Sequence, residues 1–276
     1  MKKIYLTLVL GVLFICGCSR LDMAYRWADT YIASKVDDYF DISSAQSKAL
    51  KKDIQKDLGV LKTSLLPQWT ERLESIQKDI ESGTLSDSKV AVYFASFFKD
   101  VDQINSHFAT TAVDFISNTK ASQIEYFKKS FNKKNQEDIE KAQNTAKLQK
   151  TQREKYADAF EMFLGTLTKE QEQWIAESVE KSPYPSELKA KNKAYIFKEF
   201  ITHQDSMDEM KKFVRDYTTQ ADKFDMPEYR AAYEVYQLNL QKLVSQIMLN
   251  LTPKQKLALK SNINDKTAQL RSISSL

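Results

Sequence analysis

The fold class is decided by residues 50–80, which read LKKDIQKDLGVLKTSLLPQWTERLESIQKDI. Apolar side chains recur in this stretch at steps of three and four residues, which is the spacing of one face of an α-helix. The stripe keeps its phase through Pro67, because proline removes a backbone hydrogen bond without shifting the helical register. The sequence therefore predicts one long helix over residues 50–80, kinked near Pro67.

Similar apolar stripes recur along the rest of the chain and cover residues 21–39, 90–115, 156–163 and 229–247. Gly83 supplies a turn between the stripes of residues 50–80 and 90–115. We therefore expect these two helices to pack as an antiparallel hairpin, with the mid-stripe residues Leu73 and Phe97 in the core.

The scarcity of turn-forming residues supports the same fold class. Only 5 glycines and 5 prolines occur in 276 residues, whereas an average protein carries roughly 12% of the two together. Sheets need many turns, so the prediction is an all-α protein whose long antiparallel helical hairpins form an extended bundle. One helical domain over residues 21–276, or two halves with a boundary near residues 182–185 (Ser-Pro-Tyr-Pro), both fit the sequence.

The first residues carry the features of a secretory signal. Lys2 and Lys3 precede an apolar stretch over residues 4–15, which is too short to span a bilayer stably. The following Ile15-Cys16-Gly17-Cys18 resembles the bacterial lipobox. This resemblance implies that residues 1–17 are a cleaved signal peptide and that Cys18 is acylated, for example with palmitate.

Residues 18–20 would then form the lipid anchor and a very short tether. Ser19 after the cysteine implies, by resemblance to enterobacterial sorting, the outer membrane and a protein that faces the periplasm. A disulfide between Cys16 and Cys18 is the alternative, but two residues in an extended leader give poor geometry. Trp27 and Tyr31 in the first helix either pack beneath a neighbouring helix, the commoner case, or contact lipid headgroups.

The chain shows little that points to catalysis. It lacks GxSxG, HExxH, Walker A and GxGxxG motifs, and the sequence predicts no enzyme, no cofactor, no metal site and no small-molecule substrate. Of its 2 histidines, His203 lies on an apolar face and reads as a partly buried, hydrogen-bonded residue. Without Lys2 and Lys3 the net charge falls from +4 to +2, which is too balanced to suggest nucleic acid as a partner.

The segment over residues 132–155 is rich in lysine and poor in apolar residues. It fits a solvated helical pair or its turn, which is the commoner case, or a contact surface for an anionic partner or lipid headgroup. In the second case we expect the candidate binding residues Lys133, Lys134, Lys141 and Lys147 to lie at an end of the helical array, away from the membrane.

Three segments share one motif: Ile42-Ser43-Ser44-Ala45-Gln46, Leu167-Thr168-Lys169-Glu170-Gln171 and Leu251-Thr252-Pro253-Lys254-Gln255. Each predicts a helix start, since Ser or Thr caps a backbone N–H and Gln three residues later bonds back to the cap. The motif resembles the LTxxQ motif of the periplasmic stress proteins that include the chaperone Spy.

A broader resemblance covers nearly the whole chain. The Gly17-Cys18-Ser19 start, residues 37–42 (Asp-Asp-Tyr-Phe-Asp-Ile) leading to Gln46, Leu66-Pro67 and the late Ser182-Pro183 are similar to an uncharacterised family of all-helical Gram-negative lipoproteins. Members of that family are richer in Arg and Leu, where this chain uses Lys and Phe.

Two functions fit these features. One is a membrane-anchored module that binds other envelope proteins as a chaperone or adaptor. The other is a structural lipoprotein that assembles with copies of itself or with another complex. A chaperone should expose an apolar or basic concave face, and an assembly protein one large flat apolar patch.

Overall fold

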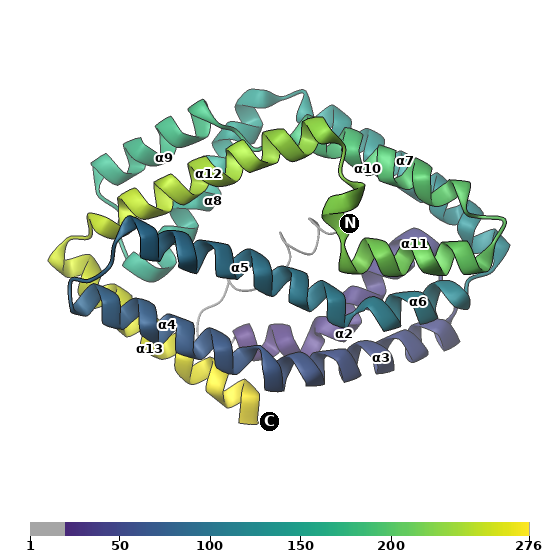
Figure 1. Cartoon of the computed structure of the whole chain (residues 1–276), viewed down its shortest axis with the longest axis horizontal. Coiled ribbons are helices and arrows are strands. Elements are labelled where there is room, and N and C mark those ends of the chain that lie inside the picture. Colours follow the sequence, from purple (N-terminus) through teal and green to yellow (C-terminus); the bar gives the residue numbers. More distant parts are fainter. Residues whose placement is uncertain (1–19, 276) are drawn as a thin grey trace.

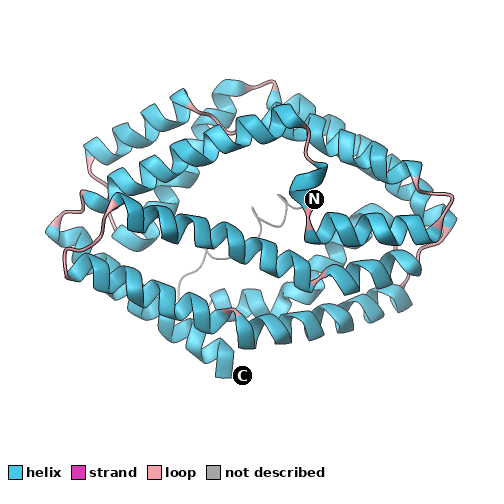
Figure 2. Cartoon of the chain, viewed as in Figure 1, coloured by secondary structure: helices cyan, strands magenta, loops and turns pink. Residues whose placement is uncertain are grey.

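The computed structural model describes residues 20–275, and all of the regular elements in that range are helices. The prediction of an all-α protein is confirmed. The elements are α2 (Arg20–Phe40), α3 (Ser44–Ser64), α4 (Leu66–Glu81), α5 (Asp87–His107), α6 (Ala109–Ser117), α7 (Ala121–Ala142), α8 (Thr145–Leu164), α9 (Lys169–Lys181), α10 (Ser186–Thr202), α11 (Met207–Thr219), the 3₁₀ helix η1 (Ala221–Phe224), α12 (Pro227–Leu249) and α13 (Pro253–Ser275). Figure 2 shows these helices joined by short connections.

The helices form a flattened oval array (Figure 1). Helices far apart in the sequence pack in pairs: α4 on α13, α6 on α11, α7 on α10 and α5 on α12. The last helix, α13, also contacts α2, so the first and last described helices meet. The array is therefore closed by contacts between early and late parts of the chain.

Two main apolar cores lie at opposite ends of the array. The first core joins α4, α8, α9, α12 and α13, and its buried members are Ile80, Leu164, Leu167, Ile175, Leu243, Ile247, Leu251, Leu259 and Ile263. The second core joins α2, α6, α7, α10 and α11, and its buried members are Phe40, Ile116, Ile124, Phe127, Phe131, Phe200, Met210 and Phe213.

The position of the two cores bears on the boundary expected near residues 182–185. These residues form the short connection between α9 and α10. Each core takes helices from both sides of that connection. The connection is therefore a turn within one packed array, and the two cores do not correspond to sequential halves of the chain.

The kinked helix predicted over residues 50–80 is present as α3 and α4. The helical path breaks at Leu65, two residues before Pro67. The backbone N–H of Leu65 still donates to Leu61 and its carbonyl accepts from Trp69, at 2.8 and 3.0 Å. The break is therefore a change of direction with the apolar register retained, as expected from a proline near a helix start.

The stripe over residues 90–115 also divides into two helices, because α5 ends at His107 and α6 begins at Ala109. We expected this stripe to pack along the whole of residues 50–80, but only part of it does so. Helix α6 packs on α3, whereas the apolar face of α4 packs on α13.

Polar side chains, rather than the two apolar stripes, join α4 to α5. The buried carboxylate of Asp100 in α5 accepts hydrogen bonds from Trp69 Nε1 at 2.9 Å and from both terminal nitrogens of Arg72. Near the Gly83 turn, the carboxylate of Asp79 accepts from Tyr93 Oη at 2.7 Å and from Lys89 Nζ at 2.5 Å. The hairpin between α4 and α5 is thus spaced and aligned by two carboxylates.

The two residues expected at mid-stripe differ in their surroundings. Leu73 packs against the first core and against a smaller cluster around Leu66 and Leu270. Phe97 is only half-buried and is a member of none of the four core clusters of the described residues. The expectation of a core position was wrong for Phe97, because a stripe identifies the apolar face of a helix but not what lies opposite.

Candidate functional site

The lysine-rich segment over residues 132–155 spans the end of α7 and the start of α8. In Figure 1 the connection between these helices lies along the upper edge of the array, whereas α2 begins on the lower side. Lys133, Lys141 and Lys147 are exposed. Lys141 lies 3.7 Å from the carboxylate of Glu137 one turn before it, and such exposed pairs add little stability.

Lys134 makes structural contacts instead. Its Nζ donates to the backbone carbonyl of Asp38 at 3.0 Å, lies 3.7 Å from the Asp38 carboxylate and sits 4.0 Å from the centre of the Tyr39 ring. The C-terminal end of a helix attracts cations, so Lys134 joins α7 to the end of α2. The four lysines predicted as one surface therefore divide into Lys134, which fixes the fold, and three exposed residues.

The predicted helix starts are present at α3, α9 and α13. In each, the side-chain amide oxygen of Gln accepts from the backbone N–H of the cap residue: Ser43 to Gln46 at 3.0 Å, Thr168 to Gln171 at 3.0 Å and Thr252 to Gln255 at 3.1 Å. A fourth start, unexpected from the sequence, occurs at α7, where the Lys120 N–H donates to Gln123 at 3.0 Å. Its cap is a lysine, so a search for Ser or Thr does not find it.

These four glutamines form two pairs, which we call the glutamine clamps. In the first clamp the amide groups of Gln46 and Gln123 donate to each other at 3.0 and 2.9 Å. In the second, Gln171 and Gln255 donate to each other at 3.2 and 2.7 Å. Each clamp joins the starts of two helices that lie 77 or 84 residues apart in the sequence.

Further bonds to backbone carbonyls complete both clamps. Gln46 donates to Asn118 at 2.9 Å, Gln123 to Asp41 at 3.2 Å and Gln255 to Thr166 at 3.0 Å. Gln171 and Gln255 are only 1% and 3% exposed, so their polar groups depend on these partners. The repeated motif therefore serves the fold, with one clamp at each main core.

Helix α5 leaves part of its apolar face outside the cores. Val90 and Val101 of α5 are buried. Between them Phe94, Phe97 and Phe98, which we call the phenylalanine trio, are half-buried and belong to none of the four core clusters of the described residues. Their rings contact one another, with Phe98 centred 5.1 Å from Phe94 and 5.6 Å from Phe97.

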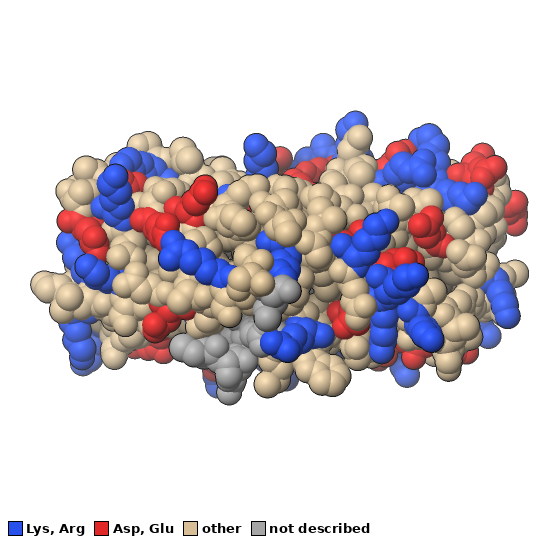
Figure 3. All heavy atoms as spheres, turned by 90° about the horizontal axis from the view of Figure 1, so that it is seen from below, with Lys and Arg blue, Asp and Glu red and all other residues tan. Residues whose placement is uncertain are grey.

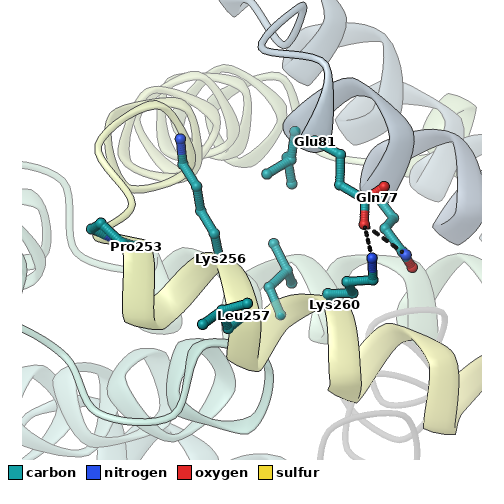
Figure 4. A pocket seen from close by; sticks show the side chains of 8 residues that line it. Gln77, Glu81, Pro253, Lys256, Leu257 and Lys260 are labelled. Atoms are coloured by element: carbon teal, nitrogen blue, oxygen red, sulfur yellow. Dashed lines mark hydrogen bonds and ion pairs between the residues drawn. The ribbon is translucent and has the colours of Figure 1, made fainter.

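A groove lies between the end of α4 and the start of α13 (Figure 4). Its volume is about 440 Å³, and it is lined by Gln77, Ile80, Glu81, Pro253, Lys256, Leu257, Leu259 and Lys260. Lys260 Nζ lies 3.0 Å from the Glu81 carboxylate, which also accepts from Gln77 at 3.1 Å. The hydrogen bonds from Lys260 and Gln77 hold the pKa of Glu81 below its usual range, so its charge is already compensated.

A tyrosine-rich junction joins α8, α12 and the connection between α9 and α10, where Tyr184 lies. The hydroxyls of Tyr156 and Tyr236 lie 2.6 Å apart, and the Tyr184 ring is centred 5.0 Å from the Tyr236 ring. Burial raises the pKa of Tyr184 to about 12, whereas burial and the charge of Lys193 lower the pKa of Lys189 to about 8. Near neutral pH the junction thus presents protonated hydroxyls, which suit packing and hydrogen bonding better than nucleophilic chemistry.

The remaining sequence candidates do not converge on a reactive centre. His203 is half-buried against the Phe213 ring, with its Nδ1 3.4 Å from the Glu209 carboxylate. Among residues 20–275 there is no group of three or more His, Cys, Asp and Glu side chains arranged to hold a metal ion. Cys18 and the signal-peptide prediction over residues 1–17 lie outside the described residues.

None of the helices in the described part of the chain is long and apolar enough to cross a membrane. A family model with the description "Family of unknown function (DUF6279)" matches residues 38–230, which is more than half of the chain. No curated protein and no solved structure matches the chain.

Proposed function

This chain belongs to the DUF6279 family of unknown function, and for it we propose the role of a membrane-anchored periplasmic lipoprotein that binds other envelope proteins. The anchor is Cys18, exposed after cleavage of residues 1–17, and the membrane is the outer membrane. The lipobox-like residues Ile15-Cys16-Gly17-Cys18 support this part of the proposal. No catalytic activity is part of it.

The observation that carries the binding role is the phenylalanine trio. Half-buried aromatic rings are common at sites that hold apolar segments of a partner, because they bury a large area with few rotatable bonds. Polar contacts hold α5 at a fixed spacing from α4, so the trio is presented on a rigid element. Binding of unfolded or partly folded segments is the activity that fits such a surface.

The distribution of other apolar residues favours binding over assembly. The large apolar side chains that are exposed are spread over seven helices of the described part of the chain: α2 and α12 carry three each, and α3, α5, α7, α10 and α13 carry one each. A structural lipoprotein should instead gather such residues in one large patch. The exposed Lys133, Lys141 and Lys147 would add a weaker, salt-sensitive attraction to acidic partners.

The anchor is tested with Cys18→Ser. We expect the precursor to keep its full length and to lose labelling by a fatty-acid probe, because the thiol is the acylation site. Fractionation of wild-type cells should recover the protein with the outer membrane. Unchanged processing and labelling of the variant would contradict the anchor, and recovery with the inner membrane would contradict the sorting.

The binding role is tested with a soluble chain that starts at Ser19, added to an unfolded client protein. We expect it to slow client aggregation and expect Phe97→Ser with Phe98→Ser to remove most of this effect, since the apolar contact is lost. Val92→Ser is the matched control, because Val92 is 66% exposed on the opposite face of α5. Circular dichroism checks that both variants remain helical.

Charge is tested separately by changing Lys133, Lys141 and Lys147 to Gln. We expect weaker capture of acidic clients at low salt and no difference at high salt. If wild-type protein neither slows aggregation nor captures a partner, the structural role is the better explanation. If the phenylalanine changes leave the activity intact, the phenylalanine trio is not the binding surface.

A further inference from the structure

Helix α2 carries a continuous apolar stripe on its exposed side. Met23, Trp27 and Tyr31 follow one another at four-residue steps and are 55%, 62% and 45% exposed. Such a stripe is about 12 Å long. Trp27 is exposed, whereas Trp69 donates to Asp100 and Trp174 packs against the first core.

The opposite side of the same helix is firmly packed. Ala33 and Asp29 are 1% and 6% exposed, Tyr25 Oη donates to the Leu58 carbonyl at 3.1 Å, and Gln55 donates to Asp29 at 2.7 Å. Helix α2 also contacts α3, α7 and α13. The stripe therefore lies on a well-anchored helix, and among residues 20–275 no neighbouring helix covers Trp27 and Tyr31.

The position of Cys18 limits where this stripe can lie. Met23 follows Cys18 by five residues, and five residues span at most roughly 17 Å when fully extended. The headgroup layer on each side of a bilayer is several ångströms thick. An acylated Cys18 would therefore hold the first turns of α2 at the level of the headgroups or just outside them.

The chemistry of the stripe fits that location. Tryptophan and tyrosine are enriched at membrane–water interfaces, where an apolar ring and a polar edge are both solvated. Lys35, next to the stripe, lies 5.5 Å from the centre of the Tyr31 ring and is paired with the Asp38 carboxylate at 3.0 Å. Figure 3 shows basic and acidic side chains interspersed over the face seen from below. Attraction to anionic lipid is therefore not required.

We propose that Met23, Trp27 and Tyr31 insert into the headgroup region of the bilayer that holds the Cys18 acyl chains, so that α2 lies along the membrane surface. The proposal rests on the acylation of Cys18 in the proposed function. It gives the protein a second membrane contact and a fixed orientation, with the α7–α8 connection on the side of the array away from the start of α2 (Figure 1).

The test uses the full-length protein after processing and acylation, reconstituted into phosphatidylcholine vesicles that contain lipid brominated near the headgroup. Bromine quenches tryptophan only at short range. We expect part of the tryptophan emission to be quenched and expect Trp27→Phe to abolish that part. The matched control adds Val92→Trp to Trp27→Phe, which places an exposed tryptophan on α5, and this tryptophan should not be quenched.

The outcomes separate the two proposals. Acylated protein whose emission is unaffected by brominated lipid, or equally quenched in Trp27→Phe, would overturn the membrane contact of α2 and leave the lipid anchor standing. Protein that carries no fatty acid and shows no quenching would overturn both. Acylated protein with quenching that depends on Trp27 supports the contact.

Discussion

Asp100→Ala is expected to lower the free energy of unfolding by about 3–5 kcal/mol, the range for breaking a buried ion pair from one side. Asp100 is 4% exposed and accepts hydrogen bonds from Trp69 and from both terminal nitrogens of Arg72. Its removal leaves the guanidinium of Arg72, whose side chain is 22% exposed, without this partner. It also removes the contact that aligns α4 with α5.

Urea denaturation of the soluble chain measures this loss. Asp114→Ala is the control, because Asp114 is an exposed carboxylate of α6, and we expect a change within about 0.5 kcal/mol. Adding Arg72→Met to Asp100→Ala should restore part of the stability, since the stranded charge is removed as well. A loss below about 1 kcal/mol for Asp100→Ala would show that α4 and α5 do not depend on this carboxylate.

Gln255→Ala is expected to lower the free energy of unfolding by about 2–3 kcal/mol. The change removes the bond from the Thr252 N–H, the bond to the Thr166 carbonyl and both bonds to Gln171. The Gln171 side chain, which is 1% exposed, then loses its clamp partner in a site closed to water. Its unmet hydrogen bonds account for much of the expected cost.

The same denaturation experiment tests the clamp as a pair. Gln173→Ala is the matched control, because Gln173 is exposed on α9 two residues after Gln171, and we expect it to be nearly neutral. The double change of Gln171 and Gln255 to Ala should cost less than the sum of the single changes by at least about 0.5 kcal/mol. Strict additivity would mean that the two amides do not depend on each other.

Local signals in the sequence predicted much of the fold. The kinked helix over residues 50–80 could be predicted because the apolar spacing and the effect of a proline on the backbone both depend on residues close together in the sequence. The Ser or Thr and Gln pairs predicted the starts of α3, α9 and α13 for the same reason. The pairing of Gln171 with Gln255 joins residues 84 positions apart, so no local pattern contains it.

The candidate site was less predictable, because exposure depends on what lies opposite each helix face. Phe97 was expected in the core but lies outside the core clusters of the described residues. Lys134 was expected on an exposed contact surface but is fixed against the end of α2. Among the described residues, no helix covers the exposed face of Trp27, which is 62% exposed. For Lys134 the contact that decides its role, with the Asp38 carbonyl, joins residues 96 positions apart.

The meeting of α13 with α4 and α2 has a consequence for how the molecule is made. The first core includes Ile80 and also Leu259 and Ile263, so it is incomplete until α13 is available. Contacts across such long separations slow folding. A chain that emerges amino end first leaves the apolar face of α4 without its partner until α13 has been made. Loss of the last helix at any later stage would reopen that face and expose the protein to aggregation and proteolysis.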